Sequence, residues 1–290
     1  MLVLLFLIFL FGLIIGSFLN VVIFRLGTKK SALKGRSFCP HCKHTLAWYD
    51  LIPVLSFVLL KGQCRYCAKK ISWQYPLVEI ATGLLFLQTF VFVNFVRHAE
   101  FISASSVVDF GSATEMTTLI IQCGLLLAVG SLLIIIFVYD LKHYLIPDKI
   151  IFPAIAIAFL YRISLQSTVY GLRPSVGAKL LTLTTFYPLF AAFGAATFFL
   201  LLVLITRGKG MGIGDIKLAF LMGLLLSWPQ ITTALFIAFL SGGLIGLALI
   251  LTRKKKLKSM VPFGPFLASG TIIALFWGEK IINWYWKILL

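Results

Sequence analysis

Residues 1–24 read MLVLLFLIFLFGLIIGSFLNVVIF, an apolar run without a charged side chain. An α-helix rises about 1.5 Å per residue, so about 20 such residues cross the hydrocarbon core of a bilayer. The run lacks the basic start and the small-residue cleavage pattern of a secretory signal, and it is long enough to span. We therefore expect a retained first transmembrane helix.

Comparable runs recur along the chain, which has 290 residues, is 60% hydrophobic and has a mean hydropathy of +1.03. Water-soluble domains of this length do not reach such values, and a transmembrane barrel would show alternating strands of about 10 residues. The fold class is therefore all-α, a polytopic membrane protein with about eight transmembrane helices. These helices are expected at residues 2–24, 77–96, 118–139, 150–163, 180–205, 215–228, 231–251 and 262–283.

Two of the expected helices, at residues 150–163 and 215–228, are short for a full span. Non-helical backbone at membrane depth must line a cavity or be buried in protein. We therefore expect these short helices to border a site.

The net charge of +17 is unevenly distributed, because 20 of the 26 Lys and Arg lie in the joints at 25–76, 140–149, 206–217 and 252–261. Basic joints face the cytoplasm and meet anionic lipid headgroups. Both termini then lie on the outside. A chain whose termini share one side crosses the membrane an even number of times, and eight helices satisfy this condition. No aromatic-basic face or nucleic-acid module accompanies the charge, so we expect no nucleic-acid partner.

The largest joint divides the chain into a first transmembrane helix (1–24), a small cytoplasmic domain (25–76) and a seven-helix membrane domain (77–290). The joint contains CPHC, with Cys39 and Cys42, and 21 residues later CRYC, with Cys64 and Cys67. Two such pairs are typical of a four-thiolate structural zinc site.

A domain of this size buries too little surface to fold alone, and a structural zinc supplies the missing folding energy. A redox pair or two disulfides are alternatives, which the reducing cytosol disfavours. His41 or His44 could also replace a sulfur ligand. Cys123, inside an apolar run, is interpreted as a small buried apolar residue.

Acids are rare in this chain, and two of them adjoin apolar runs at the same predicted membrane boundary. Asp140 ends the third expected helix, and Asp215 follows three glycines in KGMGIGDIK (209–217). A carboxylate so placed tends to face a partner or a wet cavity. Two that face each other share a single proton near neutrality, so that one takes a proton from water while the other donates to a scissile carbonyl. The sequence therefore predicts an aspartic-protease dyad.

The glycines before Asp215 lack side chains, so an extended substrate backbone could approach the carboxylate over Gly210, Gly212 and Gly214. The alternative is that the acids cap helices: Asp140 caps or pairs with a nearby lysine, and Asp215 caps the sixth helix. For Asp148 we favour the interpretation that it caps the fourth helix.

Taken together, these residues resemble the type IV prepilin peptidases, bifunctional leader peptidase/N-methyltransferases. The resemblance is carried by GSFLNVVIFRL (16–26), the two cysteine pairs, WYDLIPVLSFVLLKGQCRYC (48–67), ISWQYPLVE (71–79), DLKHYLIPD (140–148), GMGIGDIKL (210–218) and VPFGPFLASG (261–270).

The resemblance implies a multi-pass enzyme of the inner (plasma) membrane with both termini periplasmic. It would cleave after a glycine on the cytoplasmic side and remove the short basic leader of pilin-like precursors. It would then methylate the new N-terminal residue with S-adenosylmethionine. Asp140 and Asp215 would be the proteolytic acids, and Glu79 and the cytoplasmic domain would belong to the methylation half. No glycine-rich nucleotide fingerprint is present, so methylation rests on the resemblance alone.

The +9 cytoplasmic domain would not attract a basic leader, so recognition is expected to depend on the substrate's apolar stem and on local acids such as Asp148. Two rival functions remain open. A general intramembrane aspartyl protease shares the Tyr-Asp and Gly-x-Gly-Asp signatures but lacks the zinc domain. A non-enzymatic scaffold or ion transporter would carry its acids nearer the middle of the bilayer.

Overall fold

The structure is a computed structural model, and it describes residues 2–28, 35–103, 113–172, 178–208, 211–252 and 261–289. Gly210, which the sequence placed beside the substrate, lies outside the described residues. The chain divides into two compact units, residues 1–95 and 96–290, and each unit is described by itself.

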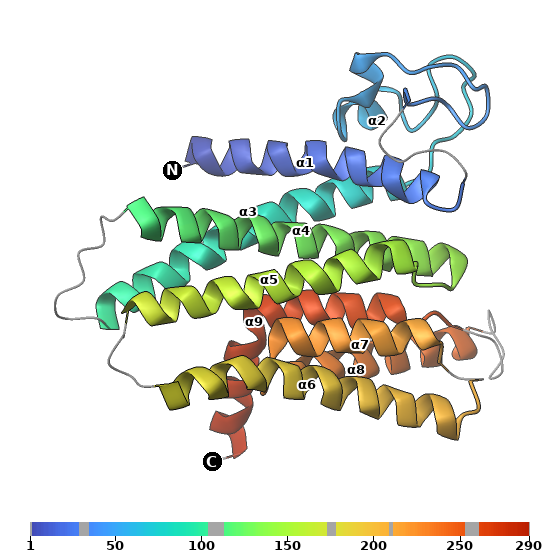
Figure 1. Cartoon of the computed structure of the whole chain (residues 1–290). Coiled ribbons are helices and arrows are strands. Elements are labelled where there is room, and N and C mark those ends of the chain that lie inside the picture. Colours follow the sequence, from blue (N-terminus) through green and yellow to red (C-terminus); the bar gives the residue numbers. More distant parts are fainter. Residues whose placement is uncertain are drawn as a thin grey trace. The chain divides into compact units, whose positions relative to one another are not determined.

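The first unit contains α1 (Leu2–Arg25), the 3₁₀ turn η1 (Trp48–Leu51), the short α2 (Leu55–Leu59) and the beginning of α3 (Gln74–Ser103), as Figure 1 shows. Glycines bring α1 and α3 close together. A Cβ on Gly12 would lie 2.8 Å from Gly83 Cα, and a Cβ on Gly16 would lie 2.6 Å from Glu79 Cα. Small residues four apart are typical of tightly packed membrane helices.

Polar contacts reinforce this pairing at the end that adjoins the cysteine-containing joint (25–76). The Asn20 side chain donates to the Tyr75 carbonyl (3.0 Å), and buried Arg25 donates to the Gly35 and Arg36 carbonyls. The sequence block 16–26 thus anchors the polypeptide on both sides of the cysteine domain.

The second unit contains six helices within the described residues: α4 (Ala113–His143), α5 (Asp148–Leu172), α6 (Ala178–Ile205), α7 (Ile213–Leu226), α8 (Gln230–Leu251) and α9 (Gly264–Leu289). The short α7 packs against α5, α6 and α9, and Figure 1 shows it among the longer helices of this unit. Its side chains Leu218, Leu221 and Met222 are fully buried. At Gly223 the backbones nearly touch, because a Cβ there would lie 2.4 Å from Ala192 Cα. The core of this unit is therefore built around α7.

No β-strand occurs in the described ranges, which agrees with the all-α prediction. Six of the described helices, α1, α3, α4, α6, α8 and α9, are long and apolar enough to cross a membrane. The chain is therefore a multi-pass membrane protein. The other two predicted helices, at 150–163 and 215–228, correspond to α5 and α7.

The prediction of a short sixth helix is confirmed, since α7 has 14 residues and is about 21 Å long. The prediction of a short fourth helix is wrong, because α5 has 25 residues. Polar side chains after Leu160 find partners and so do not end the helix. Arg162 bonds to the end of α7, and the Ser164 hydroxyl donates to the Tyr161 carbonyl. Arg162 thus lies inside α5.

Candidate functional site

The four predicted cysteine ligands come together in the first unit. The Sγ atoms of Cys39, Cys42, Cys64 and Cys67 all lie within 4.8 Å of one another. The Cys39 and Cys67 sulfurs are 4.0 Å apart, about twice a disulfide bond, and all four thiols are free. Sulfurs around a tetrahedral zinc ion are roughly 3.8 Å apart. The cluster could therefore hold a metal ion.

The cluster is built from two cysteine hairpins, residues 38–45 and 63–70, that repeat the same hydrogen bonds. In the first, the Cys39 amide donates to the His44 carbonyl and the Lys43 amide donates to the Cys39 carbonyl. In the second, the Cys64 amide donates to the Lys69 carbonyl and the Ala68 amide donates to the Cys64 carbonyl. Lys43 and Ala68, at the same position of each hairpin, have φ angles of 58° and 54°. This local repeat had not been recognised in the sequence.

Hydrogen bonds in the first hairpin favour ionisation of one sulfur, that of Cys39. Burial of the Cys39 thiol opposes its ionisation, but hydrogen bonds from the Cys42 and His41 amides and from neighbouring thiols outweigh that effect. They hold the pKa of Cys39 at about 7. His44 stacks its ring on Tyr66, with centroids 3.8 Å apart. The thiols alone thus supply a complete tetrahedral donor set.

Asp50, to which the sequence gave no role, is tied to the second hairpin. Its carboxylate accepts hydrogen bonds from Arg65 (2.8 Å), from the Tyr66 hydroxyl (3.1 Å) and from the Ala47 amide (3.2 Å). Burial opposes ionisation of this carboxyl, but the bond from Arg65 and the other donors outweigh it and hold the pKa of Asp50 below its ordinary value. Asp50 therefore stabilises the cysteine domain in its charged form.

Glu79 lies in the second turn of α3 and is 7% exposed. Its carboxylate accepts a hydrogen bond from the Val54 amide (2.8 Å) and one from the Ser17 hydroxyl. The segment between the cysteine hairpins is thus fastened to α3 through this acid.

In the second unit, Asp140 lies near the end of α4 and is 5% exposed. Its carboxylate accepts a hydrogen bond from the Gly264 amide at the beginning of α9. A Cβ on Gly264 would lie 2.6 Å from Oδ2 of Asp140. The acid therefore packs directly on the α9 backbone.

Asp215 is the third residue of α7 and is 7% exposed. Its Oδ2 accepts a hydrogen bond of 3.1 Å from the amide of Gly212, the N-cap residue of α7. The Asp215 side chain therefore bonds back to the start of its own helix. A Cβ on Gly212 would meet little, since its nearest neighbour is the Gly214 nitrogen at 3.9 Å. A Cβ on Gly214 would press on buried Ile146 at 3.0 Å. Gly214 thus permits packing, whereas Gly212 borders open space.

Ile146 packs beside glycines that adjoin both acids. It lies against Gly214, beside Asp215, and its Cδ1 would be 3.3 Å from a Cβ on Gly264, the glycine that touches Asp140. The Asp140 and Asp215 carboxyls are close enough to interact electrostatically. Two buried acids from α4 and α7 thus occupy one cluster, each bonded to a backbone amide.

Asp148 is the first residue of α5 and does not act as its cap in the predicted way. The Ile150 and Ile151 amides bond to the Pro147 carbonyl instead. The Asp148 carboxylate pairs with Lys217 of α7 (2.5 Å), and Lys217 lies over the Phe152 ring. A lysine two residues after Asp215 was thus a partner that local sequence could not reveal.

Sequence reasoning also missed Arg162 and Gly264. A signal for Arg162 was present, because an arginine within an apolar run marks a functional or structural polar contact. Gly264 gave no signal beyond its place in VPFGPF, since its importance depends on the position of Asp140 in another helix.

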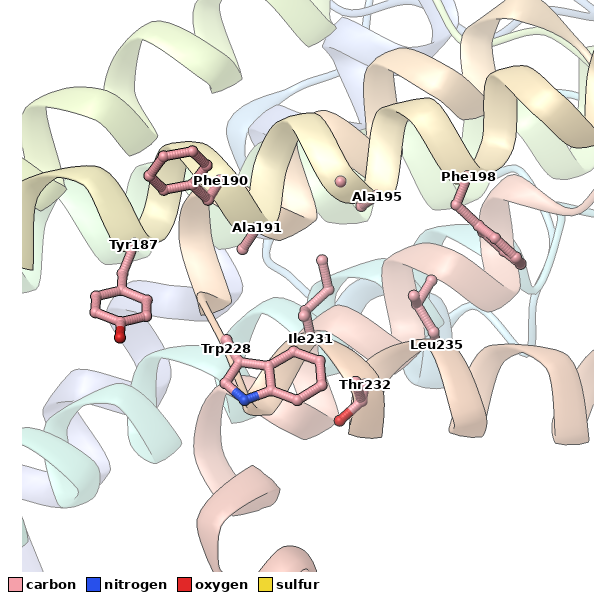
Figure 2. A pocket seen from close by; sticks show the side chains of 10 residues that line it. Tyr187, Phe190, Ala191, Ala195, Phe198, Trp228, Ile231, Thr232 and Leu235 are labelled. Atoms are coloured by element: carbon pink, nitrogen blue, oxygen red, sulfur yellow. The ribbon is translucent and has the colours of Figure 1, made fainter. Parts of the chain in front are cut away.

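A cavity of about 390 Å³ lies between α6 and α8 (Figure 2). Its lining is mostly aromatic and aliphatic, with Tyr187, Phe190 and Phe198 on α6, Trp228 just before α8, and Ile231 in the first turn of α8. Neither Asp140 nor Asp215 is among the residues that line it.

Comparisons with known proteins cover both units. A family model described as the bacterial peptidase A24 N-terminal domain matches residues 10–93, and that of the type IV leader peptidase family matches residues 127–247. No solved structure matches the chain.

Among the relatives are proteins named prepilin leader peptidase/N-methyltransferase. The one from Bacillus subtilis (strain 168) is 34% identical, over 97% of this chain and 98% of its own. Those from Aeromonas hydrophila and Legionella pneumophila are 33% and 30% identical, over 96% and 95% of this chain and 92% of each relative. The chain described here belongs to the type IV leader peptidase family.

Proposed function

We propose that this chain is a membrane aspartic endopeptidase that removes the short basic leader of type IV prepilins or pseudopilins after a glycine and then N-methylates the new N-terminus. The observation that carries the peptidase half is the cluster of two buried acids, Asp140 and Asp215. The methylation half is supported by the names of the relatives, which match nearly the full length of the chain.

In the proposed cleavage, Asp140 and Asp215 share one proton. The charged carboxylate takes a proton from water, and the water oxygen attacks the scissile carbonyl carbon. The protonated carboxyl donates to the carbonyl oxygen. The C–N bond of the tetrahedral intermediate then breaks, and the leaving amine receives a proton from the acid that had accepted one. Gly212 offers the open side from which a substrate backbone would approach.

For methylation, S-adenosylmethionine would supply the methyl group to the new α-amino group. We propose that Glu79 belongs to this half, because it is a buried carboxylate that bonds to the segment between the cysteine hairpins. The described residues contain no glycine-rich nucleotide-binding loop, so we assign no binding site to S-adenosylmethionine.

We propose that the metal is a structural Zn²⁺ held by Cys39, Cys42, Cys64 and Cys67. Four clustered thiols favour zinc, because four sulfur ligands are the usual donor set of a closed structural zinc site. The ion would contribute folding energy to a domain with few buried aliphatic side chains.

The proposed topology has residues 25–76 in the cytoplasm between the first helix (1–24) and the membrane domain (77–290), with both termini periplasmic. The concentration of Lys and Arg in alternate joints supports it. Partners would then be the precursor substrates and anionic lipids, and Asp148 would be available to a basic leader only in competition with Lys217.

The decisive experiment incubates the purified protein with a pilin precursor and S-adenosylmethionine, and determines the mass of the product's first residue. Asp140→Asn and Asp215→Asn are expected to abolish cleavage at unchanged protein abundance. Glu279→Gln, which alters an acid that bonds to Gln230, is the matched control and should cleave normally. Full cleavage by either Asp variant would refute the dyad, and trimming without methylation would identify a plain intramembrane protease.

A further inference from the structure

Gly264 begins α9 in direct contact with Asp140. A Cβ at this position would lie 2.6 Å from Oδ2 and 3.1 Å from Cγ of the acid. Non-bonded carbon and oxygen atoms do not approach so closely, so any side chain at residue 264 would displace the carboxyl or the start of α9.

The sequence around Gly264 leaves one backbone amide at the start of α9 that can donate to Asp140. Pro265 has no N–H, and the amides of Phe266 and Leu267 already donate to the Phe263 carbonyl at 3.0 and 3.2 Å. The Gly264 amide instead donates to the Asp140 carboxylate. This donor stands at the positive end of a helix of 26 residues, where a negative charge is stabilised.

We propose that Gly264 is a positioning residue for the cleavage reaction: its amide fixes one oxygen of Asp140, and its missing side chain provides the space that this oxygen occupies. The inference rests on the proposed role of Asp140 in catalysis. The other oxygen of the carboxyl then remains available to Asp215 and to the attacking water.

The arrangement matches that of the second acid. Asp215 has one oxygen bonded to the Gly212 amide at the beginning of α7. Both carboxyls are therefore held through backbone donors at helix starts, which cannot rotate as side chains do. A shift of about 1 Å in a reacting group can lower a rate by about 100-fold, so fixing the carboxyls in this way affects the rate directly.

The test compares Gly264→Ala with Gly243→Ala in the purified full-length protein. Gly243 lies in α8, and a Cβ there would meet no atom within 4 Å. Gly264→Ala is expected to lower kcat for precursor cleavage by about 100-fold or more, with KM changed by less than about twofold. Methylation of an already trimmed pilin should be unchanged in both variants, which shows that the protein has folded.

A second substitution distinguishes a simple packing defect from the loss of Asp140 positioning. A Cβ on residue 264 would also lie 3.3 Å from Ile146 Cδ1, an atom that Ile146→Val removes. If Gly264 served only to accommodate Ile146, the double variant Gly264→Ala/Ile146→Val would regain cleavage. We expect no recovery, because the clash with Asp140 remains.

The hydrogen bond is tested without adding any atom by replacing the residue 264 amide with an ester through incorporation of glycolic acid. This change removes the N–H and is expected to lower kcat by about tenfold or more. Normal cleavage by Gly264→Ala or by the ester protein, or recovery in the double variant, would overturn the positioning role. Cleavage by Asp140→Asn would instead overturn the proposed function itself.

Discussion

Arg162 of α5 donates a hydrogen bond of 2.7 Å to the backbone carbonyl of Leu224 at the end of α7. The same guanidinium reaches the Leu225 carbonyl (2.6 Å) and the Ser227 hydroxyl (2.5 Å). The last carbonyls of a helix have no partner within the helix, and inside a membrane water cannot replace one. Arg162 therefore secures the far end of α7, the helix whose first turn contains Asp215.

Removal of this cap should impair cleavage from a distance. Arg162→Gln is expected to leave at least one carbonyl unsatisfied, at a cost of about 1–3 kcal/mol, and to lower both the melting temperature and the cleavage rate. Arg162→Lys should give a melting temperature and a cleavage rate between those of wild type and Arg162→Gln, because an ammonium lacks the planar fork that reaches two carbonyls. Arg207→Gln, at an exposed arginine, is the control. Equal melting temperatures for wild type and Arg162→Gln would contradict the capping role.

Loss of one thiol should release the metal. Cys39→Ser or Cys64→Ser is expected to lower the zinc content, measured by elemental analysis, and to impair methylation more than cleavage, because the cysteine hairpins and Glu79 lie in the first unit. Cys123→Ser, which changes a cysteine outside the cluster, should retain the metal. An unchanged zinc content in the Cys39 and Cys64 variants would refute the site.

The cysteine domain should lose a stabilising contribution at low pH. Because the pKa of folded Asp50 is depressed, its contribution is fully present above the ordinary carboxyl pKa of about 4 and disappears as the pH falls through the lower folded value. Wild type should therefore melt higher than Asp50→Asn at pH 7, and the difference should shrink only below about pH 4. Both proteins carry the same cysteines, so metal loss cancels in the comparison. A difference that vanished already near pH 6 would exclude this ion pair as its source.

Glu79→Gln should separate the two activities. Glutamine retains an oxygen that can accept the Val54 amide but loses the charge, so the fold should persist. We expect methylation of a trimmed pilin to fall by at least about tenfold, with precursor cleavage within about twofold of wild type. Undiminished methylation would remove Glu79 from the methylation half.

Sequence reasoning located features that depend on spacing and hydrophobicity. Apolar runs predicted the helices, and the two Cys-x-x-Cys pairs predicted a cluster that the structure brings together. Sequence reasoning did not find the contacts between residues on different helices. The continuation of α5 past Leu160 depends on the carbonyls of α7, and the ion pair of Asp148 depends on Lys217. Neither partner is visible in the local pattern of either helix.

The hydrogen bond from Val54 to Glu79 would give a bound metal an influence beyond its own ligands. Val54 lies on the stretch between the two cysteine hairpins, so a bound ion would join both ends of that stretch into a closed loop. Closing a loop restricts the conformations of everything within it. The occupancy of the thiol cluster and the environment of a carboxylate in α3 would thereby be linked, although the ion and the acid would share no bond.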